Sequence, residues 1–164
     1  MFSEKPLAAS VEVGERLVQA EKDSGTFLML GYHKRSDPAT MLAKEKVDAF
    51  RASGELGPLK YVRILMPPAS WPGFGFKELI TADDSMPSLE MDPPASDMSD
   101  EVFEDYYRFV NYYIHQINLM RHFLGEDYSV TYVSSSDVVL AVESASGVAG
   151  IIEMAPYVTS LGWQ

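Results

Sequence analysis

The chain has 164 residues, 46% of them hydrophobic, which is enough for a domain with a real core, and its lack of cysteine excludes disulfides and thiolate metal sites. Its 24 acidic and 13 basic side chains give a formal charge of −11, which argues against nucleic acid and anionic membrane surfaces as partners. No apolar run approaches the roughly 18 residues of a membrane helix, and no signal peptide is recognisable. We therefore expect a cytoplasmic protein.

The first third of the chain alternates patterns typical of helices and strands. Residues 10–25 are loosely amphipathic and predict a helix, and the apolar run at 26–32 predicts a short buried strand. A capping residue before Pro38 predicts a helix over 36–57 that ends at a glycine. Residues 58–68 predict a strand that is closed by prolines.

The acidic stretch from Asp83 to Asp105 contains nine acids and no base, and with its prolines it predicts a long solvated loop, with a lid over a site as the alternative. Residues 109–125 predict a helix. Three strand-like runs follow within residues 129–158, and the sequence SASG between the last two indicates a hairpin.

This order predicts an α+β fold, an open mixed and mostly antiparallel β-sheet with helices on one face, preceded by the terminal βαβ portion of a Rossmann-type domain. The natural domain boundary lies at Gly31–Tyr32. We expect residues 1–31 to be the tail of a dinucleotide-binding domain and residues 32–164 to be a truncated substrate-binding α/β domain.

The helix predicted at 109–125 is mostly apolar, yet it carries a polar stripe of Asn111, His115, Asn118 and His122 at helical spacing. We expect this stripe to face a cleft, with His122 as a structural or surface residue. The two histidines are seven residues apart, whereas chelation on a helix favours a spacing of four. We expect no metal site.

Three segments together resemble the Gfo/Idh/MocA family of NAD(P)-dependent oxidoreductases. They are EKPLA from Glu4, GYHKRSDPA from Gly31 with GELGPLKYVRI after it, and NYYIH from Asn111, which has the form [D/N]-x-x-x-H. The glycine-rich fingerprint of that family is absent, so the resemblance implies a fragment that binds NAD or NADP weakly. The cofactor would belong to the full-length parent.

The resemblance implies roles for particular residues. His115 is the acid/base, Lys5 positions the substrate by its charge, and Asn111 stands where the family usually has aspartate and contacts substrate or histidine. Glu4, Lys5, Pro6 and Arg35 would lie at the cofactor. Tyr32 and Trp71 would join Asn111 and His115 at the substrate.

The expected activity is hydride transfer between NAD(P) and a sugar or polyol hydroxyl, by a homo-oligomer that associates through its sheet. Two alternatives stay open on the same fold. One is a non-catalytic sugar-binding or dimerisation module, which the neutral Asn111 and the missing fingerprint favour. The other is an NAD-dependent lyase or glycosidase.

Overall fold

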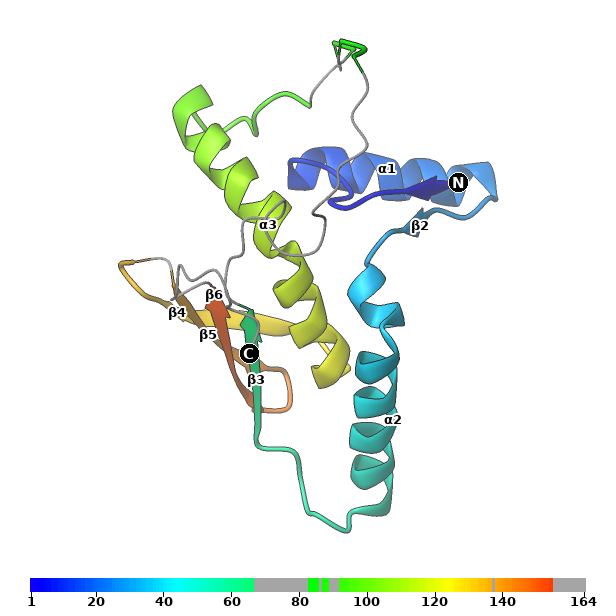
Figure 1. The fold of residues 1–164 in the computed structure, drawn as a ribbon, viewed down its shortest axis with the longest axis vertical. Helices are drawn as coiled ribbons and strands as arrows, with labels where there is room; N and C mark the ends of the chain where they lie inside the picture. Colours follow the sequence, from blue (N-terminus) through cyan, green and yellow to red (C-terminus); the bar gives the residue numbers. More distant parts are fainter. Residues whose placement is uncertain (67–82, 86, 89–91, 137, 155–164) are drawn as a thin grey trace. The chain divides into compact units, whose positions relative to one another are not determined.

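The computed structural model describes residues 1–66, 83–85, 87–88, 92–136 and 138–154, and these divide into two units that interleave along the sequence (Figure 1). The first unit comprises Met1–His33 and Asp84–His115, and the second comprises Lys34–Asp83 and Gln116–Gln164. The domain boundary expected at Gly31–Tyr32 stays a prediction.

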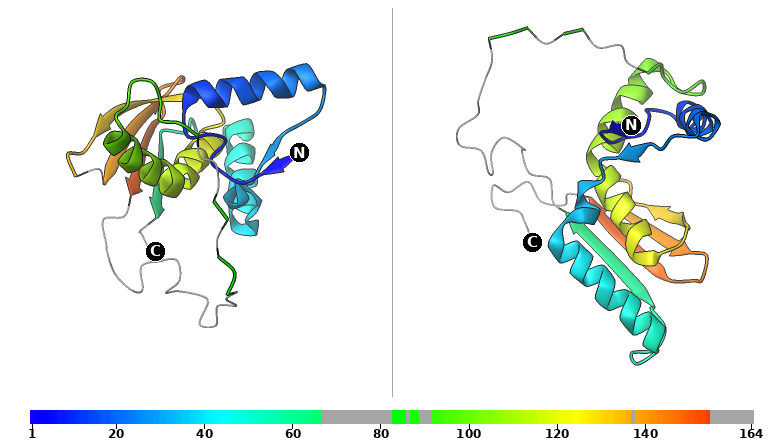
Figure 2. Two further views of the ribbon diagram at one scale, coloured as in Figure 1. Left: turned by 90° about the horizontal axis from the view of Figure 1, so that it is seen from above. Right: turned by 90° about the vertical axis from the view of Figure 1, so that its right-hand side faces the viewer.

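The first unit contains a parallel strand pair joined by a helix (Figures 1 and 2). Strand β1 (Phe2–Ser3) pairs with β2 (Met29–Leu30), and α1 (Val11–Ser24) connects them. The Ser10 side chain accepts from the backbone of Val13 at 3.2 Å and so caps α1. This arrangement confirms the terminal βαβ portion, although the strand predicted at 26–32 has only two paired residues because β1 offers no more.

The second unit contains a four-stranded sheet in the order β3-β6-β5-β4. Strands β3 and β6 are parallel, and the other two pairs are antiparallel, which confirms the mixed, mostly antiparallel sheet (Figure 2). Gly147 occupies the β5–β6 turn at φ 82°, a left-handed conformation that favours glycine, at the hairpin the sequence indicates. The strands are β3 (Tyr61–Met66), β4 (Tyr128–Val133), β5 (Val139–Ser144) and β6 (Ala149–Met154).

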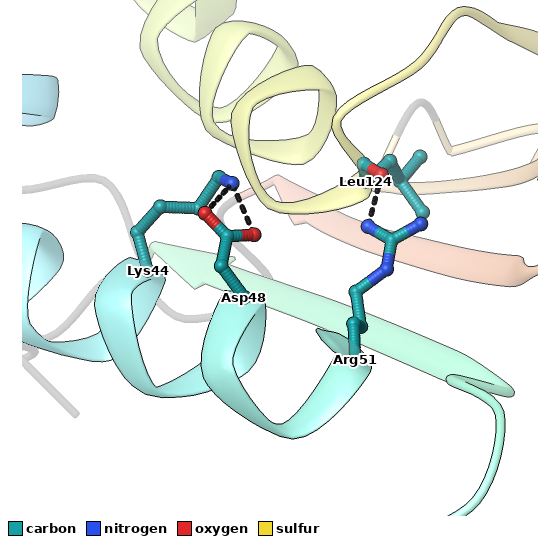
Figure 3. A network of polar contacts seen from close by, with 4 residues as sticks. All are labelled: Lys44, Asp48, Arg51 and Leu124. Atoms are coloured by element: carbon teal, nitrogen blue, oxygen red, sulfur yellow. Dashed lines mark hydrogen bonds and ion pairs between the residues drawn. The ribbon is translucent and has the colours of Figure 1, made fainter. Parts of the chain in front are cut away.

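A short 3₁₀ helix, η1 (His33–Ser36), leads into α2 (Pro38–Ser53). The Asp37 carboxylate accepts from the backbone of Ala39 at 2.9 Å and caps α2 as the sequence predicts. At the other end of α2, Arg51 Nη1 donates to the carbonyl oxygen of Leu124 at 2.6 Å (Figure 3). This bond links α2 to the last turn of α3 (Asp100–Leu124) within the second unit.

The core of the second unit forms where the end of α3 (Asp100–Leu124) packs on the sheet. Met120 and Leu124 are fully buried and lie one turn apart, so they project from the same face of the helix. Gly150 of β6 makes this approach possible, because a Cβ there would lie 2.8 Å from Met120 Cε and 2.6 Å from Val142 Cγ2. The buried apolar side chains of β5 and β6 are Leu140, Val142, Ile152 and Met154.

Helix α3 begins at Asp100, nine residues before the start predicted from sequence, so the acidic stretch is not a loop throughout. The backbone of Phe103 donates to the Ser99 carbonyl at 2.9 Å, and Asp100 and Glu101 occupy the first turn, where negative charge favours the helix dipole. Among the residues described, neither α3 nor any other helix is long and apolar enough to cross a membrane.

Candidate functional site

Lys5, directly after β1, is bound to the middle of α3 within the first unit. Its ammonium donates to the backbone carbonyl of Asn111 at 2.6 Å and to the Asn111 side-chain oxygen at 2.9 Å. The two residues are 106 positions apart in the chain. The structure therefore brings together two of the residues that the sequence singled out.

The residue that binds the Lys5 ammonium, Asn111, is uncharged. Burial lowers the pKa of Lys5 below its usual 10.5, and the neighbouring Glu4 carboxylate opposes that change. The Asn111 amide fixes the ammonium without neutralising it, whereas an aspartate there would form an ion pair. Lys5 is therefore an oriented positive charge that can stabilise an oxyanion.

His115 lies one helical turn after Asn111 and touches a second histidine. Its ring centroid is 4.7 Å from that of His33, and the planes meet edge to face at 66°. The ring is half-buried, and its Nδ1 is shielded from solvent. No sequence pattern indicates the contact of His33 with His115, because the pairing depends on the tertiary fold.

A hollow of about 250 Å³ opens beside Lys5. Pro6, Ala8, Asp92 and Tyr107 are among its lining residues. The backbone of Ala9 donates to Asp92 Oδ2 at 3.2 Å, so part of the acidic stretch is fixed next to Lys5. The Lys5–Pro6 peptide is cis.

Asp92 and Tyr107 were not among the residues expected to bind cofactor or substrate, and Tyr107 was expected only to pack at the cleft or an interface. A signal for Tyr107 existed, because it precedes Asn111 by four residues and His115 by eight and so extends their stripe. Asp92 offered no such signal within its acidic, proline-containing neighbourhood.

The remaining expected site residues have different placements. Glu4 lies in the first unit, where its Oε2 would be 3.3 Å from a Cβ on Gly31, and Tyr32 is the second residue after β2. Arg35 belongs to the second unit, where its Nε donates to Asn118 Oδ1 at 2.5 Å. Trp71 lies outside the described residues.

The polar stripe of α3 is therefore divided between the two units. Asn111 and His115 belong to the first unit, and Asn118 and His122 belong to the second. The expectation that all four face one cleft stays a prediction. Among the residues described, no group of three or more His, Asp and Glu side chains is placed to hold a metal ion.

The residues of the βαβ portion do not fit a dinucleotide pyrophosphate. The connection from β1 to α1 is EKPLAAS, without the glycine turn that lets phosphates approach a helix N-terminus. Glu12 occupies the first turn of α1, and Asp92 accepts from Ala9 just before it. These carboxylates would repel a pyrophosphate.

Replacing Asn111 by aspartate should raise the pKa of Lys5 by about 1 pH unit, because an adjacent anion favours the ammonium. The side-chain NMR resonances of Lys5, followed against pH, measure this change. Gln19→Glu, an amide-to-acid change at an exposed position of α1, is the matched control and should leave the pKa of Lys5 unchanged. An equal effect of both variants would contradict the Lys5–Asn111 contact.

Solved structures that are described as dehydrogenases or oxidoreductases share this fold over part of their length. An NAD-binding oxidoreductase from Klebsiella pneumoniae matches with a TM-score of 0.57 and 19% identity, over 94% of this chain and 41% of its own. A protein from Sinorhizobium meliloti 1021 assigned as a myo-inositol dehydrogenase matches with a TM-score of 0.56 and 20% identity, over 96% of this chain and 44% of its own.

A third similar structure, assigned as a dehydrogenase, comes from Bordetella bronchiseptica RB50 and has a TM-score of 0.57 and 14% identity, over 95% of this chain and 37% of its own. The chain thus spans about two fifths of the length of these structures. No protein-family model and no curated protein sequence matches it. At these identities the likeness shows the fold, and at that level it confirms the resemblance to Gfo/Idh/MocA oxidoreductases.

Proposed function

We propose that the chain carries the substrate half of an oxidoreductase that moves hydride between NAD(P) and a sugar or polyol hydroxyl. The observation that carries this proposal is the pair of hydrogen bonds from the Lys5 ammonium to Asn111, one turn before His115 on the same helix. They hold a positive charge at Asn111, one helical turn before the half-buried imidazole of His115. A general base and an oriented cation are groups that can promote the oxidation of an alcohol.

Each group has a role at the substrate hydroxyl. A neutral His115 accepts the hydroxyl proton, because an imidazole titrates near physiological pH. Lys5 stabilises the negative charge that develops on the same oxygen, and Asn111 keeps the ammonium in place without cancelling its charge. NAD(P) supplies the hydride acceptor, and its phosphates would be bound by residues outside those described.

The substrate class follows from the hollow beside Lys5 and from the comparisons. Asp92 and Tyr107 add a carboxylate and a phenol to its lining, and both can accept hydrogen bonds from hydroxyl groups. One similar structure is assigned as a myo-inositol dehydrogenase, which acts on a polyol. A polyol or sugar is therefore the substrate class that we infer.

A non-catalytic sugar-binding module is the second candidate. The neutral Asn111, engaged with Lys5 where the family usually has aspartate, favours it. Such a module would keep polyol binding and show no turnover when it is joined to a dinucleotide-binding domain.

Association through the sheet is part of the same proposal. Tyr61 of β3 and Tyr132 of β4 are 51% and 58% exposed, and their strand register places both on the face opposite the buried residues Leu140, Val142 and Ile152. Covering that face by a second copy would remove this aromatic surface from water.

Calorimetry on the 164-residue chain tests whether it binds the substrate but not the cofactor. We expect myo-inositol to bind and NADH to bind weakly or not at all. Lys5→Met should weaken polyol binding about tenfold or more, and Lys22→Met, at an exposed site near the end of α1, should not. Tight NADH binding, or polyol binding that is indifferent to Lys5, would contradict the proposal.

A further inference from the structure

A group of cationic side chains lies in the second unit, around a hollow of about 520 Å³. It is lined by residues of η1, α2, the end of α3 and the turn after it, chiefly Arg35, Lys44, Arg121, His122, Glu126 and Asp127. The whole chain has 13 basic residues against 24 acidic ones. Three of the 13 basic residues line this hollow beside two acids, so the lining carries more positive than negative charge although the whole chain is acidic.

Arg35 is held in a fixed orientation by a neutral group. Its Nε donates to Asn118 Oδ1 at 2.5 Å, and this amide restrains the guanidinium without cancelling its charge. A planar guanidinium presents several donors in a rigid fork that matches the oxygens of a phosphate. The remaining guanidinium nitrogens of Arg35 can serve that purpose.

The nearby acids are mostly engaged already. Both Asp48 oxygens contact Lys44 Nζ at 2.5 Å (Figure 3), and Ser146 donates to the Glu126 carboxylate. Asp127 lies 3.6 Å from Arg121, which is a loose contact. The Lys44 ammonium therefore offsets the charge of Asp48, whereas the hydrogen bond from Ser146 leaves Glu126 negatively charged.

A cation also lies at the C-terminus of α3, which is the negative end of the helix dipole. Arg51 donates to the carbonyl oxygen of Leu124 at the last turn (Figure 3), so a cation sits at the helix C-terminus next to the hollow. Burial lowers the pKa of His122, and the charges of Arg35 and Lys44 lower it further against the opposing effect of Asp48.

We propose that this hollow binds the phosphate group of a small ligand, with Arg35 as the oriented fork, and Arg121, Lys44 and His122 as further donors. The donors come from three different elements, η1, α2 and α3, and the tetrahedral array of phosphate oxygens can accept hydrogen bonds from several of them at once. The ligand is inorganic phosphate or a phosphomonoester. This site is separate from the residues proposed for hydride chemistry and does not depend on them.

His122 is itself the reporter for the test. The chain has three histidines, so their ring protons can be titrated by NMR and assigned with His122→Gln. Inorganic phosphate should raise the pKa of His122 by about 0.5 pH unit or more over sodium chloride of equal ionic strength, because a bound anion favours the imidazolium. His33 and His115 should not respond.

Two variants decide whether the response belongs to this hollow. Arg35→Gln should abolish the effect of phosphate, and Arg16→Gln, the same change at an exposed position of α1, should preserve it. An equal rise at all three histidines, or an undiminished rise in Arg35→Gln, would overturn the proposal. So would the absence of any effect in the unaltered protein.

A second titration distinguishes the two sources of phosphate. If glucose 6-phosphate saturates the His122 response at a concentration at least tenfold lower than inorganic phosphate, the site recognises an organic phosphomonoester. If the two compounds saturate the response at similar concentrations, the site recognises the phosphate group alone. Failure of both titrations would refute the phosphate site and leave the Lys5–Asn111–His115 proposal untouched, since calorimetry with myo-inositol tests that one separately.

Discussion

Replacing His115 by alanine should lower turnover of the proposed oxidoreductase by about 10²–10⁴-fold, the range expected for loss of a general acid/base. The reason is geometric. His115 follows the Lys5-bound Asn111 by one turn, so the proposed proton acceptor lies one turn from the residue that holds the oriented cation. The measurement is the rate of nicotinamide reduction with myo-inositol at saturating cofactor.

The control for His115→Ala is Glu104→Ala, which truncates an exposed side chain on the same helix. It should turn over at the rate of the unaltered protein. Thermal unfolding of both variants shows that each is folded. A folded His115→Ala protein with an undiminished rate would remove the histidine from the mechanism and favour a different base.

The largest effect on stability is expected where α3 crosses the sheet. Met120 is fully buried, and Met120→Ala should cost about 2–5 kcal/mol through lost burial and the cavity left behind. Gly150→Ala should cost about 1–3 kcal/mol, because the added Cβ would meet Met120 and Val142 closer than normal contact. Denaturant unfolding measures both free energies.

The two changes should not be additive. The space vacated by Met120 receives the Cβ added at position 150, so the double variant should lose less stability than the sum of the single variants. An additive result would contradict the close approach between α3 and β6. The pair thus tests the packing of the second unit independently of any activity.

Much of the fold was predictable because its signals are local. A few neighbouring residues determine each of these features. They are the helix caps at Ser10 and Asp37, the turn at Gly147 and the apolar runs of the strands. The start of α3 was missed because acids and nearby prolines suggested a loop. Ser99 and the acids after it are in fact favourable for a helix N-terminus.

The candidate site was predictable only in part. Asn111 and His115 share a helical spacing, but their link to Lys5 spans 106 positions and no periodicity reports such a contact. The edge-to-face contact of His33 with His115 and the placement of Asp92 beside Ala9 are likewise tertiary. Arg35 was expected at the cofactor, and its bond to Asn118 could not be read from residue order.

The most direct test of the central claim, that Lys5 and His115 act on one bound hydroxyl compound, is a myo-inositol titration followed by NMR at both side chains. The resonances of Lys5 and His115 should change together with one dissociation constant, while those of the exposed Lys22 stay constant. Changes at only one of the two residues, or at neither, would contradict the account.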